Sequence, residues 1–141
     1  MGNLSSAEYR ALAEIRYRLR KFLAFSEQMA RSVGLEPQHH QLLLAIKGLP
    51  AGQMPTIGTL AERMVLKHHS MVELVDRVEE RGLVKRRPSE KDRRIVHVLL
   101  TPEGESIIEE LSKHHRDEFR SIAPTLIQSL STLLEQTSAH P

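Results

Sequence analysis

The feature that most constrains the fold is a change of hydrophobic period at Gly82. Before this glycine, apolar residues recur at steps of three and four, the spacing of one face of a helix. After it they recur at steps of two, the spacing of a β-strand. The sequence therefore predicts short helices followed by a β-hairpin, which is the order of elements in a winged helix-turn-helix.

The first short helix begins after Thr56, whose hydroxyl can cap the free amides of the helix. Its apolar face carries Ile57, Leu60, Ala61 and Met64. A turn separates it from a second helix, predicted from Lys67 to Arg81 and ended by Gly82 in a left-handed conformation. The inward face of that second helix carries Met71, Leu74, Val75 and Val78. Its outward face carries His69, Ser70, Val72, Glu73, Asp76, Arg77 and Glu80.

Two extended runs, Leu83–Arg87 and Arg94–Leu100, are predicted to form the hairpin, with Pro88–Arg93 as the loop between them. The segment from Arg81 to Arg94 contains seven cations and two anions, although the whole chain has a net charge of only +2. Such a concentration of positive charge is what binding to phosphates requires. The alternative is that a charged hairpin merely keeps the protein soluble.

The run LVDRVEERGLVKRRPSEKDRRIVHVLLTPEG resembles the MarR family of bacterial transcription regulators. That family joins a recognition helix, a glycine, a basic strand, a wing with Asp-x-Arg, and a strand ending in Leu-Thr-x-x-Gly. The corresponding residues here are Gly82, Asp92, Arg94, Leu100, Thr101 and Gly104. The resemblance implies a mainly α fold with a small β-hairpin wing, and a regulator that binds double-stranded DNA, more often as a repressor than as an activator.

The resemblance also implies roles for residues of the wing. Arg94 corresponds to an arginine that enters the DNA minor groove, where the negative potential is deepest over narrow A/T-rich stretches. Asp92 would orient that guanidinium, although the pair could equally just stiffen the hairpin. Contacts to phosphates are predicted for Lys85, Arg86, Arg87, Lys91 and Arg93.

The second helix is expected to contact bases and phosphates in the major groove. His68, His69 and Ser70 lie at its start, and Val72 could touch a thymine methyl group. Glu73 departs from the family, many of whose members have a basic or small polar residue at that position. Its carboxylate could accept a hydrogen bond from cytosine N4, but we favour an ion pair with Arg77 one turn later.

Length and composition fit a single domain over residues 1–141, because 40% apolar residues suffice for a core. The winged helix-turn-helix occupies approximately residues 37–101. The sequence contains no long apolar stretch and no N-terminal signal pattern, so we expect a cytoplasmic protein. Zero cysteines exclude disulfides and a thiol switch.

Helices are predicted on both sides of the winged segment. A long amphipathic helix spans approximately residues 6–33, and a linking helix spans approximately 102–120. Pro124 is expected to break the helix there, so that a last helix spans 121–138. The apolar stripe of that last helix is hard to bury in one small domain. We therefore expect the first and last helices to form a homodimer, with an inverted-repeat DNA site as the consequence.

A small anionic aromatic effector is a further expectation that the family resemblance implies. Its predicted contacts are Arg16, Arg20 and His40 as anchors for an acid and Tyr17 as a stacking partner. Phe22 is a second candidate for stacking.

Three pairs of adjacent histidines suggest a metal site. They are His39 with His40, His68 with His69, and His114 with His115. Neighbouring helical residues point about 100 degrees apart, so each pair alone is a poor chelate. We predict no metal site and no cofactor, and keep a metal-responsive member of the same family as an alternative. No motif of a catalytic site is present, so we predict no enzyme. A winged domain that binds protein is the other alternative.

Overall fold

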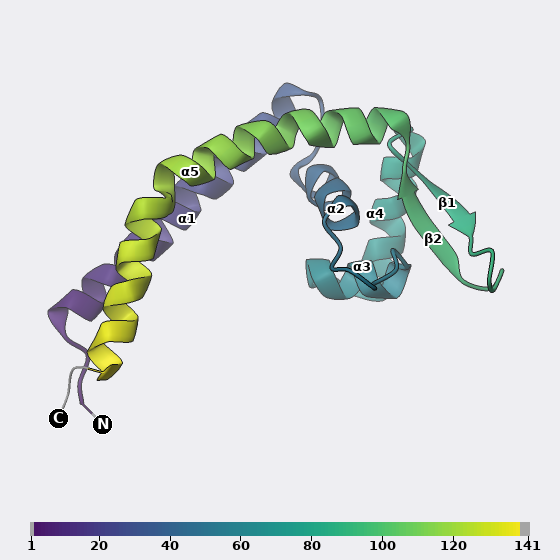
Figure 1. Ribbon diagram of the computed structural model, residues 1–141. Coiled ribbons are helices and arrows are strands. Elements are labelled where there is room, and N and C mark those ends of the chain that lie inside the picture. The colour runs from purple at the N-terminus through teal and green to yellow at the C-terminus, as the bar shows by residue number, and fades with distance from the viewer. Residues whose placement is uncertain (1, 139–141) are drawn as a thin grey trace. The chain divides into compact units, whose positions relative to one another are not determined.

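The computed structural model describes residues 2–138 of the chain (Figure 1). Five helices and two strands follow one another in this part: α1 Ser6–Ser32, α2 Pro37–Lys47, α3 Ile57–Met64, α4 His68–Glu80, β1 Val84–Pro88, β2 Val96–Leu100 and α5 Pro102–Ser138. The predicted fold class, mainly helical with a β-hairpin wing, is thereby confirmed. No helix in residues 2–138 is both long and apolar enough to cross a membrane.

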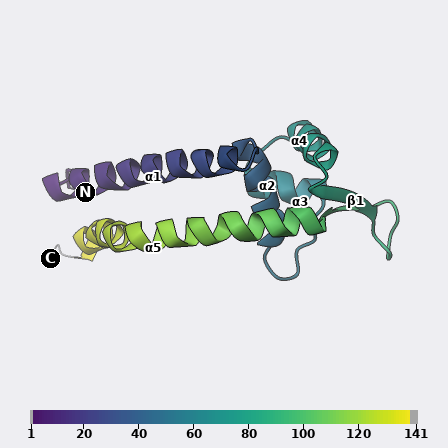
Figure 2. The ribbon, with the colours of Figure 1, turned by 90° about the horizontal axis from the view of Figure 1, so that it is seen from above.

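The chain divides into two compact units. The winged unit comprises residues 29–112 and contains α2, α3, α4, the hairpin and the first turns of α5. The helical unit comprises residues 1–28 and 113–141 and contains most of α1 and the remainder of α5. Within the helical unit the two helices lie side by side (Figures 1 and 2).

The core of the winged unit consists of the residues that the helical period placed inward. Every predicted inward residue of α4 is at least 99% buried, and Leu60 and Ala61 of α3 are buried with them. Leu42 and Leu43 of α2 and Val84 and Val98 of the hairpin complete the centre of this core. Burial of this many aliphatic side chains fixes which face of α4 remains available to a partner.

The ends of α3 and α4 follow the predicted signals. The Thr56 hydroxyl accepts a hydrogen bond from the Thr59 amide at 3.2 Å, so it caps α3 as expected. Gly82 has φ +75°, the left-handed conformation that ends α4. The predicted helix from Lys67 to Arg81 is therefore confirmed, because these two residues are the caps of α4.

The strands differ slightly from the prediction: the first is shifted by one residue and includes Pro88, and the second begins at Val96 rather than at Arg94. The antiparallel register of the hairpin runs from Val84 opposite Leu100 to Pro88 opposite Val96, so residues 94 and 95 belong to the turn rather than to the second strand. Hydrogen bonds inside the turn explain the difference. The Ile95 amide donates to the Asp92 carbonyl at 2.9 Å, and the Ser89 amide donates to the Ile95 carbonyl at 2.7 Å.

The predicted break at Pro124 is wrong, because α5 continues through that residue as one helix. The expected linking helix over 102–120 and dimerisation helix over 121–138 are thus parts of one element. A proline inside a helix removes its own amide hydrogen bond and crowds the preceding turn, but it need not end the helix when packing holds both sides. Ile122 and Ser129 are buried on either side of Pro124, which is itself exposed.

The turn between α3 and α4 contains a strained residue, Val65, with φ +55° and 89% of its surface exposed. A β-branched side chain disfavours this left-handed conformation, and Val65 has little packing to lose. We expect Val65→Asn to stabilise the protein by about 1 kcal/mol in urea unfolding. Val65→Ala, which keeps the Cβ atom, should stabilise it less. An asparagine variant less stable than the natural chain would contradict this account.

Candidate nucleic-acid interface

Helix α4 presents most of its predicted contact residues to solvent. His68, His69, Glu73 and Arg77 are exposed, whereas Ser70 and Val72 are half-buried. The helix starts beside α3 and ends where β1 begins, and the wing tip lies on the same side of the winged unit as α3 (Figure 1). The start of α4 and the tip of the hairpin are therefore available to one partner at the same time.

The predicted ion pair between Glu73 and Arg77 does not form in the structure. Within residues 2–138 neither residue takes part in an ion pair. Both side chains are exposed, and a pair in water gains too little to hold two long side chains in one geometry. Arg77 instead lies near His39 at the start of α2, where burial, Arg81 and Arg77 together lower the pKa of the imidazole.

The wing tip contains the predicted pair of Asp92 and Arg94. The Arg94 guanidinium donates two hydrogen bonds to the carboxylate, Nε to Oδ1 and Nη2 to Oδ2, both at 3.0 Å. The Arg94 amide donates to Oδ1 at 3.1 Å. These hydrogen bonds, the side-chain ones first, lower the pKa of the Asp92 carboxyl below its ordinary value. The Arg94 side chain is 91% exposed, so Asp92 orients this guanidinium without burying it.

Four of the five predicted phosphate contacts are exposed cations of the hairpin, namely Lys85, Arg87, Lys91 and Arg93. Arg86 differs from them. Its guanidinium binds two carboxylates of α4, Asp76 at 2.6 Å and Glu79, and only 29% of its side chain is exposed. This geometry argues against the prediction that Arg86 contacts phosphate, because both terminal nitrogens of its guanidinium already donate to carboxylates within the protein.

A polar junction joins the end of α4 to the start of α5. The Thr101 hydroxyl donates to the Gly82 carbonyl at 2.7 Å and accepts from the Gly104 amide at 3.1 Å. The Thr101 amide donates to the Leu83 carbonyl at 3.0 Å. Thr101 thus caps α5 and holds it against the residues that follow α4.

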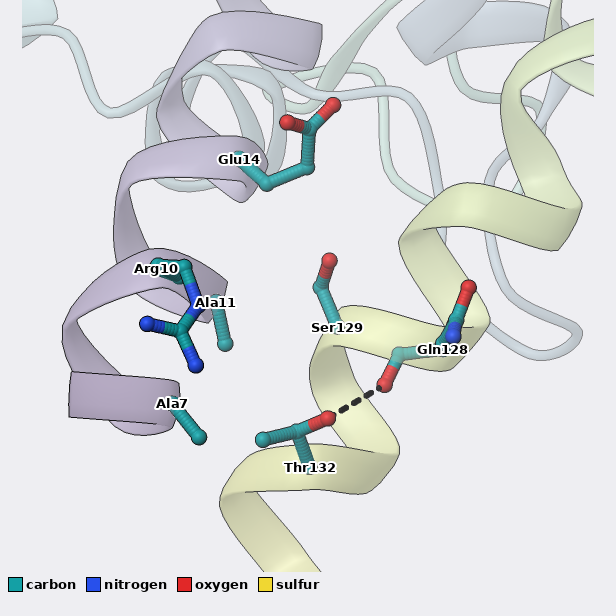
Figure 3. Close-up of a pocket in the computed structure, with 7 residues that line it drawn as sticks. All are labelled: Ala7, Arg10, Ala11, Glu14, Gln128, Ser129 and Thr132. Atoms are coloured by element: carbon teal, nitrogen blue, oxygen red, sulfur yellow. Dashed lines mark hydrogen bonds between the residues drawn. The ribbon is translucent and has the colours of Figure 1, made fainter. Parts of the chain in front are cut away.

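The predicted effector contacts do not all lie in one unit. Arg16, Tyr17 and Arg20 are exposed on α1 in the helical unit, whereas His40 is buried on α2 in the winged unit. Arg18 and Lys21 each lie 5.4 Å from the centroid of the Tyr17 ring. Figure 3 shows a pocket of the helical unit that involves none of these predicted residues; its lining is Ala7, Arg10, Ala11, Glu14, Gln128, Ser129 and Thr132.

The paired histidines differ in their surroundings. His114 is exposed, whereas His115 is buried, with Nε2 2.8 Å from the Ser26 hydroxyl and the rings of Phe22 and Phe25 at its edge. In the part of the chain that the structure describes, no three His, Asp or Glu residues are grouped in a way that could hold a metal ion. The buried His115 packs against Ser26, Phe22 and Phe25 within the helical unit.

A winged helix-turn-helix with a basic wing is typical of one class of DNA-binding protein, and comparison with known proteins shows which family the chain resembles. Residues 33–95 match the model of the MarR family. The uncharacterised HTH-type transcriptional regulator YsmB of Bacillus subtilis is 40% identical over 70 residues, which cover 47% of this chain and 48% of YsmB. The chain therefore spans about half the length of this curated relative.

Solved structures extend the likeness to the whole fold. A single-residue mutant of MarR from E. coli, solved with operator DNA, has a TM-score of 0.65 and 20% identity, covering 87% of this chain and 89% of its own. CouR from Rhodococcus jostii RHA1, solved with p-coumaroyl-CoA, has a TM-score of 0.64 and 25% identity, covering 86% and 85%. The resemblance to the MarR family is confirmed: the winged segment matches the family's model, and the chain has the fold of MarR-family structures. The named regulators are not enzymes.

Proposed function

We propose that this chain is a sequence-specific, double-stranded DNA-binding transcription regulator. The observation that carries the proposal is the exposed Arg94 guanidinium, held by Asp92 at the tip of a wing with four other exposed cations. The fixed guanidinium suits the narrow minor groove, and the surrounding cations suit phosphates. Operator DNA bound to the E. coli MarR mutant supports the same use of this fold.

Contacts to bases come from the exposed face of α4. Since Glu73 makes no ion pair among residues 2–138, its carboxylate is available to accept a hydrogen bond from cytosine N4. His68, His69 and Ser70 lie at the start of the helix, where side chains reach base edges or phosphates most readily. Val72 supplies an apolar contact of the kind that a thymine methyl group accepts.

The protein acts as a homodimer on an inverted-repeat operator. Large apolar side chains remain exposed along both helices of the helical unit, among them Tyr9 at 61%, Leu23 at 55% and Leu134 at 74%. Surfaces of this kind favour burial against a second copy. Two-fold symmetry would place two copies of α4 about one DNA turn apart, roughly 34 to 36 Å.

Regulation by a small molecule is the finer part of the proposal. The protein represses promoters, as the family resemblance implies, and an anionic aromatic effector releases it from DNA. The complex of CouR with p-coumaroyl-CoA, a larger ligand that also carries an aromatic ring and negative charge, supports an effector with these two chemical features. We place the protein in the cytoplasm, where its DNA target would lie.

Fluorescence anisotropy tests the proposal directly. One labelled duplex, called the upstream duplex, is the DNA upstream of the protein's own gene, and the other is a random sequence of equal length. Binding to each is titrated over a salt series. We expect at least about 100-fold tighter binding to the first duplex, with affinity falling steeply as salt rises. Light scattering should give two chains per duplex. A monomer, or equal and salt-independent binding to both duplexes, would overturn the proposal and favour a protein-binding module.

A further inference from the structure

A cluster of opposite charges joins the recognition helix to the wing. Glu79 of α4 contacts β1 twice: one carboxylate oxygen accepts from the Arg86 backbone amide at 2.9 Å, and the other accepts from the Arg86 guanidinium. Asp76, one turn earlier, accepts from the same guanidinium at 2.6 Å. We call these three residues the helix–wing clamp. The clamp fixes both the main chain and the side chain of one strand residue to α4.

The chemistry of the clamp separates it from the other charges of the interface. Arg86 directs its donors to two carboxylates, whereas its neighbour Arg87 is exposed and makes no ion pair in the described part of the chain. Glu79 has 36% of its side chain exposed, whereas its neighbour Glu80 is an exposed carboxylate without such contacts among residues 2–138. Charge-assisted hydrogen bonds to a guanidinium are strong and directional, so they can set an orientation.

We propose that the clamp is a positioning device for DNA binding: Asp76 and Glu79 hold Arg86, and through β1 they aim the wing relative to α4. The three residues themselves stay off the DNA. The hairpin has two strands, a small structure that needs packing or anchoring to keep one direction. Arg94 lies beyond the strands, so a fixed strand orientation fixes where its guanidinium meets the duplex. This inference rests on the proposed DNA-binding function.

The proposal makes a prediction opposite to that of simple electrostatics. A carboxylate near DNA repels phosphates, so its removal should tighten binding. Glu80→Gln removes one such charge and should leave affinity for the upstream duplex unchanged or raise it slightly. Glu79→Gln removes the same charge one residue earlier, yet we expect about tenfold weaker binding. The variant weakens the hydrogen bonds that hold Arg86, and residues of one such network depend on one another, so the wing loses its orientation. Asp76→Asn should also weaken binding, and it serves as a second variant if Glu79→Gln folds poorly.

The salt dependence of binding distinguishes positioning from phosphate contact. Arg87→Ala should make the slope of log affinity against log salt less steep by about 0.9. This is the change expected when the protein neutralises one phosphate fewer. Arg86→Ala should weaken binding without that change of slope. In addition, Arg94→Ala should cost less affinity in the Glu79→Gln background than in the natural chain, since a misdirected wing already makes this contact poorly. A loss of stability alone would not produce that coupling, and circular dichroism confirms that each variant is folded.

Two results would overturn the clamp. The first is an equal effect of Glu79→Gln and Glu80→Gln on affinity, and the second is a slope for Arg86→Ala that falls as much as that for Arg87→Ala. Failure of the proposed function has a different signature, because the natural chain itself would then show no preference for the upstream duplex. The natural chain is therefore measured first in the same titration.

Discussion

Gly104→Ala is expected to destabilise the protein by about 3 kcal/mol or more, one of the largest effects of any single methyl group on this chain. A Cβ atom at Gly104 would lie 2.1 Å from the Leu83 carbonyl oxygen and 3.1 Å from its carbonyl carbon. These are main-chain atoms, so no side-chain rotation can relieve the overlap. Helix α5 would have to move away from the segment that follows α4.

The local hydrogen bonds make such a movement costly. The Leu83 carbonyl accepts from the Thr101 amide, and the Thr101 hydroxyl binds both the Gly82 carbonyl and the Gly104 amide. Displacement of Gly104 therefore strains the cap of α5 and the junction with α4 together. Urea unfolding followed by circular dichroism measures the expected decrease in stability.

Gly58→Ala is the matched control for this experiment. Gly58 also lies in the first turn of a helix, but the nearest atom to its Cβ position is the Thr56 hydroxyl oxygen at 4.0 Å. Alanine has the higher helix propensity, so this variant should be about 0.5–1 kcal/mol more stable than the natural chain. If both variants had the same stability, the close contact at Gly104 would not explain the glycine.

Local patterns predicted much of this fold because they depend on neighbouring residues. The helical period selected the buried face of α4, and Thr56 and Gly82 marked helix ends by their own chemistry. Asp92 and Arg94 are only two positions apart, so the wing motif contained the pair entirely. Each of these features is set within about one helical turn or one hairpin loop.

Features that depend on more than local spacing, such as tertiary contacts and solvent exposure, were missed or misjudged. Arg86 looked like one more basic residue of the strand, because its partners lie seven and ten positions away on another element. Glu73 and Arg77 had the right spacing for an ion pair, but both are exposed and the spacing alone does not form one. The break predicted at Pro124 failed for a related reason, since packing along α5 outweighs the local preference of one proline.

Arg94→Ala is expected to reduce affinity for the upstream duplex by roughly 10-fold to 100-fold, while affinity for random DNA falls much less. The reason is the fixed geometry of this side chain. Asp92 holds the guanidinium with two hydrogen bonds, so less conformational entropy is lost when it enters the minor groove. Because the Arg94 side chain is 91% exposed, the variant should unfold at the same urea concentration as the natural chain.

Arg93→Ala supplies the control, because it removes the same charge from the adjacent exposed position. A contact to phosphate alone would weaken binding to both duplexes equally and lower the salt slope by about 0.9. Asp92→Ala extends the comparison. It removes a negative charge from the wing tip, and on electrostatic grounds alone this change would tighten binding. We expect weaker specific binding instead, because Arg94 loses its orientation. If Arg94→Ala and Arg93→Ala behaved alike on both duplexes, Arg94 would be one more phosphate contact, and sequence recognition would belong to α4.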